Sequence, residues 1–187
     1  MKRDATYGCN DTLRWTLTRE WGEGKSACFL GHNPSTAGHE IEDPTTLAWQ
    51  AFARAWGCGR YTAVNLYPYR SPDPAVARRW ADWALTNDWT VRDLLHENLQ
   101  LVVREAKRAD IFVACYGAIA QDDNWNQHVL EEIQTGEAPY PAIYILGLTN
   151  AGAPKHPMAR GKHRVPRDQQ PILWRGAPSS TIHYTKD

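Results

Sequence analysis

Four short apolar runs are the feature that most restricts how this chain folds. They cover Ala27–Gly31, Tyr61–Leu66, Ile111–Tyr116 and Ala142–Gly147. Each run is nearly continuous instead of alternating between apolar and polar residues. Such strands are buried on both faces, which is typical of a parallel sheet covered by helices. The sequence therefore predicts a central, mainly parallel four-stranded sheet.

Helical patterns fill the intervals between the apolar runs. They begin at Asp43, Asp73, about Asp88 and about Asn124. The first two open with Asp-Pro, which places an N-cap acceptor before a proline at the first helical position. The first ends at Gly57. Alternating strands and helices predict an α/β fold, a three-layer α/β/α sandwich with right-handed crossovers. The partly alternating stretch Leu13–Arg19 is a candidate for an N-terminal edge hairpin.

Composition indicates which classes of protein this chain can belong to. The chain has 187 residues and is 42% hydrophobic, which suits one domain with a sizeable core and excludes general disorder. No run approaches the roughly 18 apolar residues of a membrane span, and no apolar segment follows the first residues as in a secretory signal. The cysteines are scattered, without a C-x-x-C pair, as in reduced thiols. We expect a cytoplasmic protein without membrane contact.

Charge is unevenly distributed along a chain whose net charge is zero. The segment 152–167 carries five lysines and arginines, two histidines and no acidic residue. A local basic loop on a neutral protein suits a phosphate-bearing partner. A solvated loop without a partner would have the same composition, so charge alone leaves both interpretations open.

Polar or glycine-rich residues follow each apolar run. The first run leads into Gly31-His32-Asn33-Pro34-Ser35, the second ends near Asn65, the third at Tyr116-Gly117 and the fourth at Gly147. In open α/β sheets, ligands bind beyond the carboxyl ends of the strands. We therefore expect these residues to converge on one edge of the sheet.

Several segments resemble, in order, motifs of the uracil-DNA glycosylase superfamily. GHNPSTA, at residues 31–37, is similar to the Gly-x-Asn-Pro-Gly motif of the mismatch-specific branch. The later segments are YTAVNLYPYRSPDP, VACYGAIA and LGLTNAGAPKHPMARGK. The last is similar to a motif with His-Pro and a DNA-inserting loop. The chain also resembles, over nearly its whole length, an uncharacterised bacterial and phage family with an Asn-Pro-Ser-Thr-Ala motif.

Two departures from the superfamily pattern matter. Met158 follows His-Pro, where a serine is usual, which leaves the alignment of this loop open. The cysteines do not match those that hold an iron–sulfur cluster in some branches. The resemblance thus implies one uracil-DNA-glycosylase-like domain over residues 1–187, with no cofactor and no metal site.

The chemistry of base removal indicates roles for the two predicted catalytic residues, Asn33 and His156. Breaking an N-glycosidic bond leaves an oxocarbenium-like sugar, to which water adds, and a negative charge on the base. Asn33 can hold the water, and His156 can donate a hydrogen bond to a base carbonyl. The alternatives are a turn residue for Asn33 and a surface histidine for His156. Asp43 is a lesser candidate for activating the water, beside its N-cap role.

The remaining predicted site residues would bind the base and the DNA. Gly31, His32, Ser35 and Asn65 form the predicted base pocket. An amide such as Asn65 can pair with the Watson–Crick edge of an extruded base, although it can also cap a strand end. The predicted DNA-binding residues are Lys155, Met158, Arg160 and Lys162. The cations would contact phosphates, and the methionine would fill the place of the flipped nucleotide unless it is a plain loop residue.

Ser35 indicates which bases the pocket would take. The resemblance implies a tyrosine at this position in the uracil-specific branch, where it packs against C5 of the base. A serine leaves room and a hydroxyl there. A substrate with a large C5 substituent fits this change, and glucosylated hydroxymethylcytosine of phage DNA is the extreme case, with a role in antiphage defence.

Three functions compete at this point. The first is a monofunctional DNA glycosylase that acts as a monomer, since the motifs offer no lysine nucleophile for lyase chemistry. The second is an N-glycosidase that acts on free nucleotides in the same pocket. The third is a protein that binds nucleic acid without catalysis.

Overall fold

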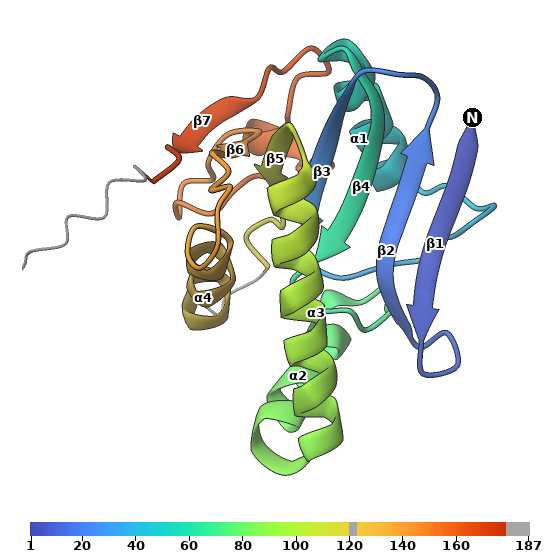
Figure 1. Ribbon diagram of the computed structural model, residues 1–187, viewed down its shortest axis with the longest axis vertical. Coiled ribbons are helices and arrows are strands. Elements are labelled where there is room, and N and C mark those ends of the chain that lie inside the picture. Colours follow the sequence, from blue (N-terminus) through green and yellow to red (C-terminus); the bar gives the residue numbers. More distant parts are fainter. Residues whose placement is uncertain (120–122, 179–187) are drawn as a thin grey trace, which may run out of the picture.

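One mixed sheet forms the centre of the protein (Figure 1). The computed structural model describes residues 1–119 and 123–178, with only the backbone described for residues 83–87 and 123. Within these residues the sheet has seven strands in the order β1-β2-β4-β3-β5-β6-β7. The strands are β1 Lys2–Gly8, β2 Leu13–Glu20, β3 Lys25–Gly31, β4 Cys58–Asn65, β5 Ile111–Ala114, β6 Ile143–Ile145 and β7 Ile172–Arg175.

The α/β class is confirmed, but the expected four-stranded sheet is wrong. The predicted strands are the central β4, β3, β5 and β6, which run parallel. β2 and β1 extend the sheet antiparallel on one side and β7 on the other. The sequence pattern does not predict β1 and β7, because their residues are largely exposed or half-buried and neither strand contains a continuous apolar run. The hairpin at Leu13–Arg19 exists, with β1 as its outer strand.

Helices cover both faces of the sheet. They are α1 Pro44–Ala55, α2 Pro74–Asn87, α3 Trp89–Arg108 and α4 Asp123–Ile133. In β3, Phe29 packs toward α1, whereas Cys28 and Leu30 pack toward α2, α3 and α4. Figure 1 shows α3 in front of the sheet and α1 behind it. This alternation explains why the strand is apolar at every position.

The helix starts predicted at Asp43, Asp73 and Asp88 are confirmed by their caps. Asp43 accepts a hydrogen bond from the Thr46 backbone N–H, and the Thr46 hydroxyl accepts one from the Asp43 backbone N–H. Asp73 and Asp88 cap α2 and α3 in the simpler way, through one side-chain acceptor. Gly57 takes a positive φ of 76° directly after the first helix ends.

Backbone hydrogen bonds connect the loops that follow the central strands. The N–H of Tyr67 donates to the His32 carbonyl, and the N–H of Ser71 donates to the Pro34 carbonyl. The N–H of Gly117 donates to the Pro154 carbonyl. These bonds hold the loops at the carboxyl ends of β3, β4 and β5 in fixed positions. No helix in the described part of the chain is both long enough and apolar enough to span a membrane.

Candidate functional site

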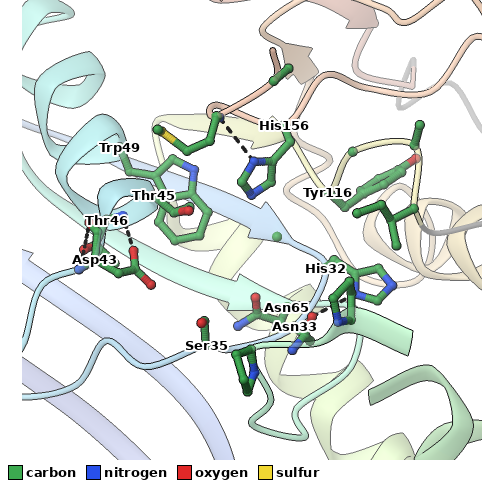
Figure 2. Close-up of a pocket in the computed structure, with 18 of the residues that line it drawn as sticks. His32, Asn33, Ser35, Asp43, Thr45, Thr46, Trp49, Asn65, Tyr116 and His156 are labelled. Atoms are coloured by element: carbon green, nitrogen blue, oxygen red, sulfur yellow. Dashed lines mark hydrogen bonds between the residues drawn. The ribbon is translucent and has the colours of Figure 1, made fainter. Parts of the chain in front are cut away.

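A cavity of about 460 Å³ opens at the carboxyl ends of β3, β4 and β5 (Figure 2). From β3 the chain continues to β4 on one side of the sheet, and β5 then pairs with β3 on the other side. The crevice at such a reversal is the usual ligand position in open α/β sheets. All predicted catalytic and base-pocket residues line the cavity, namely Asn33, His156, Gly31, His32, Ser35 and Asn65.

Asn65, at the end of β4, is the most unusual polar residue of the cavity. Its exposed fraction is 1%, and among the described residues neither Oδ1 nor Nδ2 has a hydrogen-bond partner. A side chain at Gly31 would place a Cβ atom 2.8 Å from Asn65 Oδ1, so glycine makes room for the amide. Leaving a buried polar group unpaired costs about 1–3 kcal/mol. The amide is thus available, at a cost to folding, for a ligand with a neighbouring donor and acceptor.

Asn33 is held in one orientation by the loops around it. Its Nδ2 donates to the carbonyls of Pro34 and Ser71, at 2.9 and 2.8 Å. Its Oδ1 lies 2.9 Å from His32 Nδ1. Asn33 therefore stabilises the turn. Its Oδ1 can still accept another hydrogen bond, because an amide oxygen has a second lone pair. That lone pair is what remains for a water molecule.

His32 is neutral with its proton on Nδ1. An amide oxygen can only accept, so the imidazole nitrogen facing Asn33 must be the donor. Burial lowers the pKa of His32, although the hydrogen bond with Asn33 opposes this effect. Nε2 is then an unprotonated acceptor, and it is buried without a hydrogen-bond partner in the part of the chain that the structure describes. The predicted base pocket thus contains a third unpaired polar atom in addition to the two of the Asn65 amide.

His156 has the opposite tautomer. Its Nδ1 accepts a hydrogen bond from the backbone N–H of Met158 at 3.1 Å, so the neutral ring carries its proton on Nε2. Burial lowers its pKa to about 4; the Asp43 carboxylate raises the pKa, and His32 lowers it further. The ring enters the cavity from a loop opposite Asn65 and Asn33 (Figure 2). A neutral N–H donor therefore faces the amides near neutral pH.

The cavity also contains Arg14 and Trp49, which sequence analysis did not assign to it, and Asp43, which was only a lesser candidate there. Arg14 reaches it from β2 with an exposed fraction of 2%. Trp49 forms a wall while its Nε1 donates to Cys115 Sγ at 3.3 Å. Asp43 lines the cavity as well as capping α1. The one sequence signal for Arg14 is a charged residue between apolar residues in a predicted strand.

The predicted DNA-binding residues separate into two groups. Met158 and Arg160 line the cavity and a neighbouring hollow of about 680 Å³ between α1 and the basic loop. Lys155 and Lys162 line neither. Lys155 is half-buried, and its side chain packs against Gly147, so it is poorly placed for phosphate. Met158 lines both hollows and is 43% exposed.

Cations that sequence analysis left unassigned extend the basic surface. Arg164 and Arg167 line the second hollow together with Arg160. In the part of the chain that the structure describes, these three side chains form no ion pair with a carboxylate. They are free to contact an anionic partner next to the cavity.

Fold and site together define an α/β protein with a polar, ligand-sized cavity at the carboxyl edge of its sheet. The chain belongs to the family described as protein of unknown function DUF1643, whose model matches residues 14–158. The match begins at Arg14 and ends at Met158, both of which line the cavity. Comparisons with curated proteins and with solved structures gave no match.

Proposed function

We propose that this protein is a monofunctional DNA glycosylase, a hydrolase that removes a flipped, modified pyrimidine and leaves an abasic site. The observation that carries the proposal is the buried amide of Asn65, whose donor and acceptor both lack partners. The Watson–Crick edge of a pyrimidine presents a matching acceptor and donor side by side. An amide can rotate to suit cytosine-like or uracil-like edges, so Asn65 recognises a pyrimidine edge without choosing between them.

The proposed reaction breaks the bond between C1′ and the base nitrogen, and the bonding electrons leave with the base. His156 Nε2–H donates a hydrogen bond to the base O2, where negative charge develops. Because burial lowers the pKa of His156 to about 4, the ring acts as a neutral donor. Asn33 Oδ1 orients the water that adds to C1′. The proton released from this water balances the charge of the departing base.

The surface around the cavity suits a DNA strand. Arg160, Arg164 and Arg167 surround the hollow beside the cavity, and Lys162 is exposed on the same loop. Phosphate contacts of this kind give affinity without sequence preference. Met158 would fill the place that the extruded nucleotide leaves. The partner proposed here is thus DNA, with the base reaching the cavity past Met158.

Ser35 supports a C5-substituted base as substrate. It lines the cavity, and no side chain of tyrosine size occupies its position. Cavities of about 300–1,000 Å³ hold drug-sized ligands, so 460 Å³ leaves room for more than a pyrimidine ring. Glucosylated hydroxymethylcytosine of phage DNA is the proposed extreme, and antiphage defence is the corresponding role.

The test compares base release from DNA that contains uracil, hydroxymethylcytosine or its glucosylated form. Wild type should release the substituted bases, and Ser35→Tyr should lose action on the bulky ones because the ring fills the C5 space. Thr36→Tyr is the matched control, since Thr36 is exposed and does not line the cavity. Release of uracil alone would refute the large-substituent proposal, and no abasic product from any DNA would refute the glycosylase. Equal activity on free nucleotides would favour the nucleotide N-glycosidase.

A further inference from the structure

The end of the cavity away from His32 and Tyr116 has a polar lining that base removal does not use. Arg14 and Asp43 line the cavity with opposite charges, together with the hydroxyl-bearing Ser35 and Thr45. Figure 2 shows Asp43, Thr45 and Ser35 on one side of the cavity and His32 and Tyr116 on the other. In the view of Figure 2, Ser35 lies between Asp43 and Asn65.

Arg14 is buried without a carboxylate partner. Its Nη1 donates to the Ala37 carbonyl at 2.6 Å, whereas Nε has no hydrogen-bond partner within residues 1–119 and 123–178. Among the described residues no carboxylate lies within ion-pair distance of it. Burial lowers its pKa to about 10, so it remains charged near neutral pH. A buried charge left in this state is costly unless a ligand contacts it.

Arg19, on the same strand, is also buried, but its side chain has the partners expected of a structural arginine. Its exposed fraction is 0%, its Nη2 donates to the Gly38 carbonyl at 2.6 Å, and its Nε donates to Glu42 at 2.7 Å. It does not line the cavity. Both arginines hold the same loop, but only Arg19 has its charge neutralised by a carboxylate.

Asp43 supplies the opposite charge. Its Oδ1 accepts the capping hydrogen bond from the Thr46 N–H at 2.8 Å. Its other carboxylate oxygen has no hydrogen bond within the described residues and no ion pair with Arg14. The Asp43 carboxylate raises the pKa of Arg14 against the effect of burial, so the two charges lie near each other, although no ion pair joins them within the described residues.

The opposite charges of Arg14 and Asp43 determine which kind of chemical group can bind at this end of the cavity. A phosphate or carboxylate would be repelled by Asp43, and an amine would be repelled by Arg14. A neutral group with adjacent hydroxyls can donate to the carboxylate and accept from the guanidinium at once. We propose that Arg14 and Asp43, reached past Ser35, form a subsite for a neutral polyhydroxylated substituent such as a hexosyl group. This inference rests on the proposed function and assigns residues to the C5 substituent.

The experiment measures kcat/KM for base release from DNA containing hydroxymethylcytosine and its glucosylated form, and compares the ratio of the two. Arg14→Lys keeps the charge and loses the Nε donor, and Asp43→Asn keeps the helix cap. Each should lower the ratio of glucosylated to unglucosylated activity by about tenfold or more. Arg19→Lys is the matched control and should leave the ratio unchanged.

Calorimetric titration with the free glucosylated and unglucosylated nucleosides gives a readout that does not depend on catalysis. Wild type should bind the glucosylated form more tightly, and Arg14→Lys and Asp43→Asn should lose that preference. If wild type releases no base but retains this preference, the glycosylase proposal fails and the subsite stands. Equal losses on both substrates, as a general base at Asp43 would cause, or equal binding of both nucleosides by wild type, would overturn the subsite.

Discussion

Polar side chains at the two ends of the central strands differ in whether their hydrogen bonds are satisfied. At the amino end, the backbone N–H and the hydroxyl of Ser26 both donate to Asp110 Oδ2, at 2.8 and 2.9 Å. Trp21 Nε1 donates nearby to the Cys58 carbonyl at 2.9 Å. At the carboxyl end, Asn65 and His32 retain buried polar atoms that have no hydrogen-bond partner among the described residues.

This difference indicates which polar residues serve folding and which serve a ligand. A satisfied pair such as Ser26 and Asp110 holds β3 against the residue before β5 and needs nothing further. An unpaired buried amide costs about 1–3 kcal/mol, which an apolar residue would avoid. Sites for ligands are commonly kept at a cost to stability. The comparison predicts that substitutions at the carboxyl end change activity and those at the amino end change stability.

The largest expected effect belongs to His156→Ala. A positioned donor at a developing charge is typically worth roughly 3 kcal/mol, which is about a hundredfold or more in rate. Single-turnover base release should fall by that factor while DNA affinity changes little, because the contact strengthens in the transition state. His96→Ala, on the exposed side of α3, is the control.

The pH dependence of the wild-type rate checks the same assignment. The pKa of His156 is lowered to about 4, so the ring stays neutral and the rate should not fall through its protonation between about pH 8 and pH 5. The unfolded chain binds this proton near pH 6.5, before the folded protein does. Stability should therefore decrease as the pH falls from about 6.5 to 4, and His156→Gln should remove that part of the decrease. A loss of rate that follows a pKa near 6.5, assigned to His156, would contradict the neutral donor.

Asn65→Ala should produce the next largest loss of base release, and it tests directly whether the carboxyl end serves a ligand or folding. Loss of the base-pairing amide should lower base release by about tenfold or more, since hydrogen bonds that fix a base are worth about 1–3 kcal/mol. The free energy of unfolding should stay level or rise, because two unpaired polar atoms leave a buried position. Chemical denaturation and single-turnover kinetics on the same preparation give both numbers. A clear loss of stability with normal activity would make Asn65 a strand cap.

Much of this organisation was predictable because it depends on local sequence. The Asp-Pro starts and the cap at Asp43 lie within one turn of helix, so neighbouring residues determine them. Strands β3 to β6 were found from continuous apolar runs, which parallel strands buried on both faces require. The rule that strand ends converge also brought Asn33, Asn65 and His156 together, although they are far apart in sequence.

What escaped prediction depends on contacts between distant segments. Arg14 enters the cavity because β2 pairs with β4 and its guanidinium reaches the Ala37 carbonyl, 23 residues along the chain. No local pattern distinguishes it from Arg19. Lys155 is predicted to bind DNA together with Arg160 and Lys162, and only the fold shows that its side chain packs against Gly147.

The basic loop gives a moderate effect that tests whether the carboxyl end faces DNA. Replacing Arg160 and Lys162 with glutamine should weaken binding to all DNA sequences about equally. The slope of log affinity against log salt should decrease by about 0.9 for each lost phosphate contact on duplex DNA. Lys155→Gln should change the slope less, because that side chain is half-buried. An unchanged slope in the double variant would show that DNA approaches another surface.

The smallest effect is expected at the amino end, where Ser26→Ala removes a hydroxyl that donates to Asp110 and accepts from its backbone N–H at 3.3 Å. The backbone N–H of residue 26 still donates to the carboxylate, so the free energy of unfolding should fall by only about 1 kcal/mol. Base release should stay within about twofold of wild type, as measured in the same single-turnover assay.

Acid titration separates this loss from general damage. The hydrogen bonds from Ser26 lower the pKa of Asp110, the backbone one first. A carboxyl group with a lowered folded pKa stabilises the protein above its unfolded pKa and loses this contribution as the pH falls through the folded value. The stability difference between wild type and Ser26→Ala should therefore shrink in acid. If Ser26→Ala instead slowed base release as much as Asn65→Ala, the two ends of the sheet would not differ in the way their hydrogen bonds indicate.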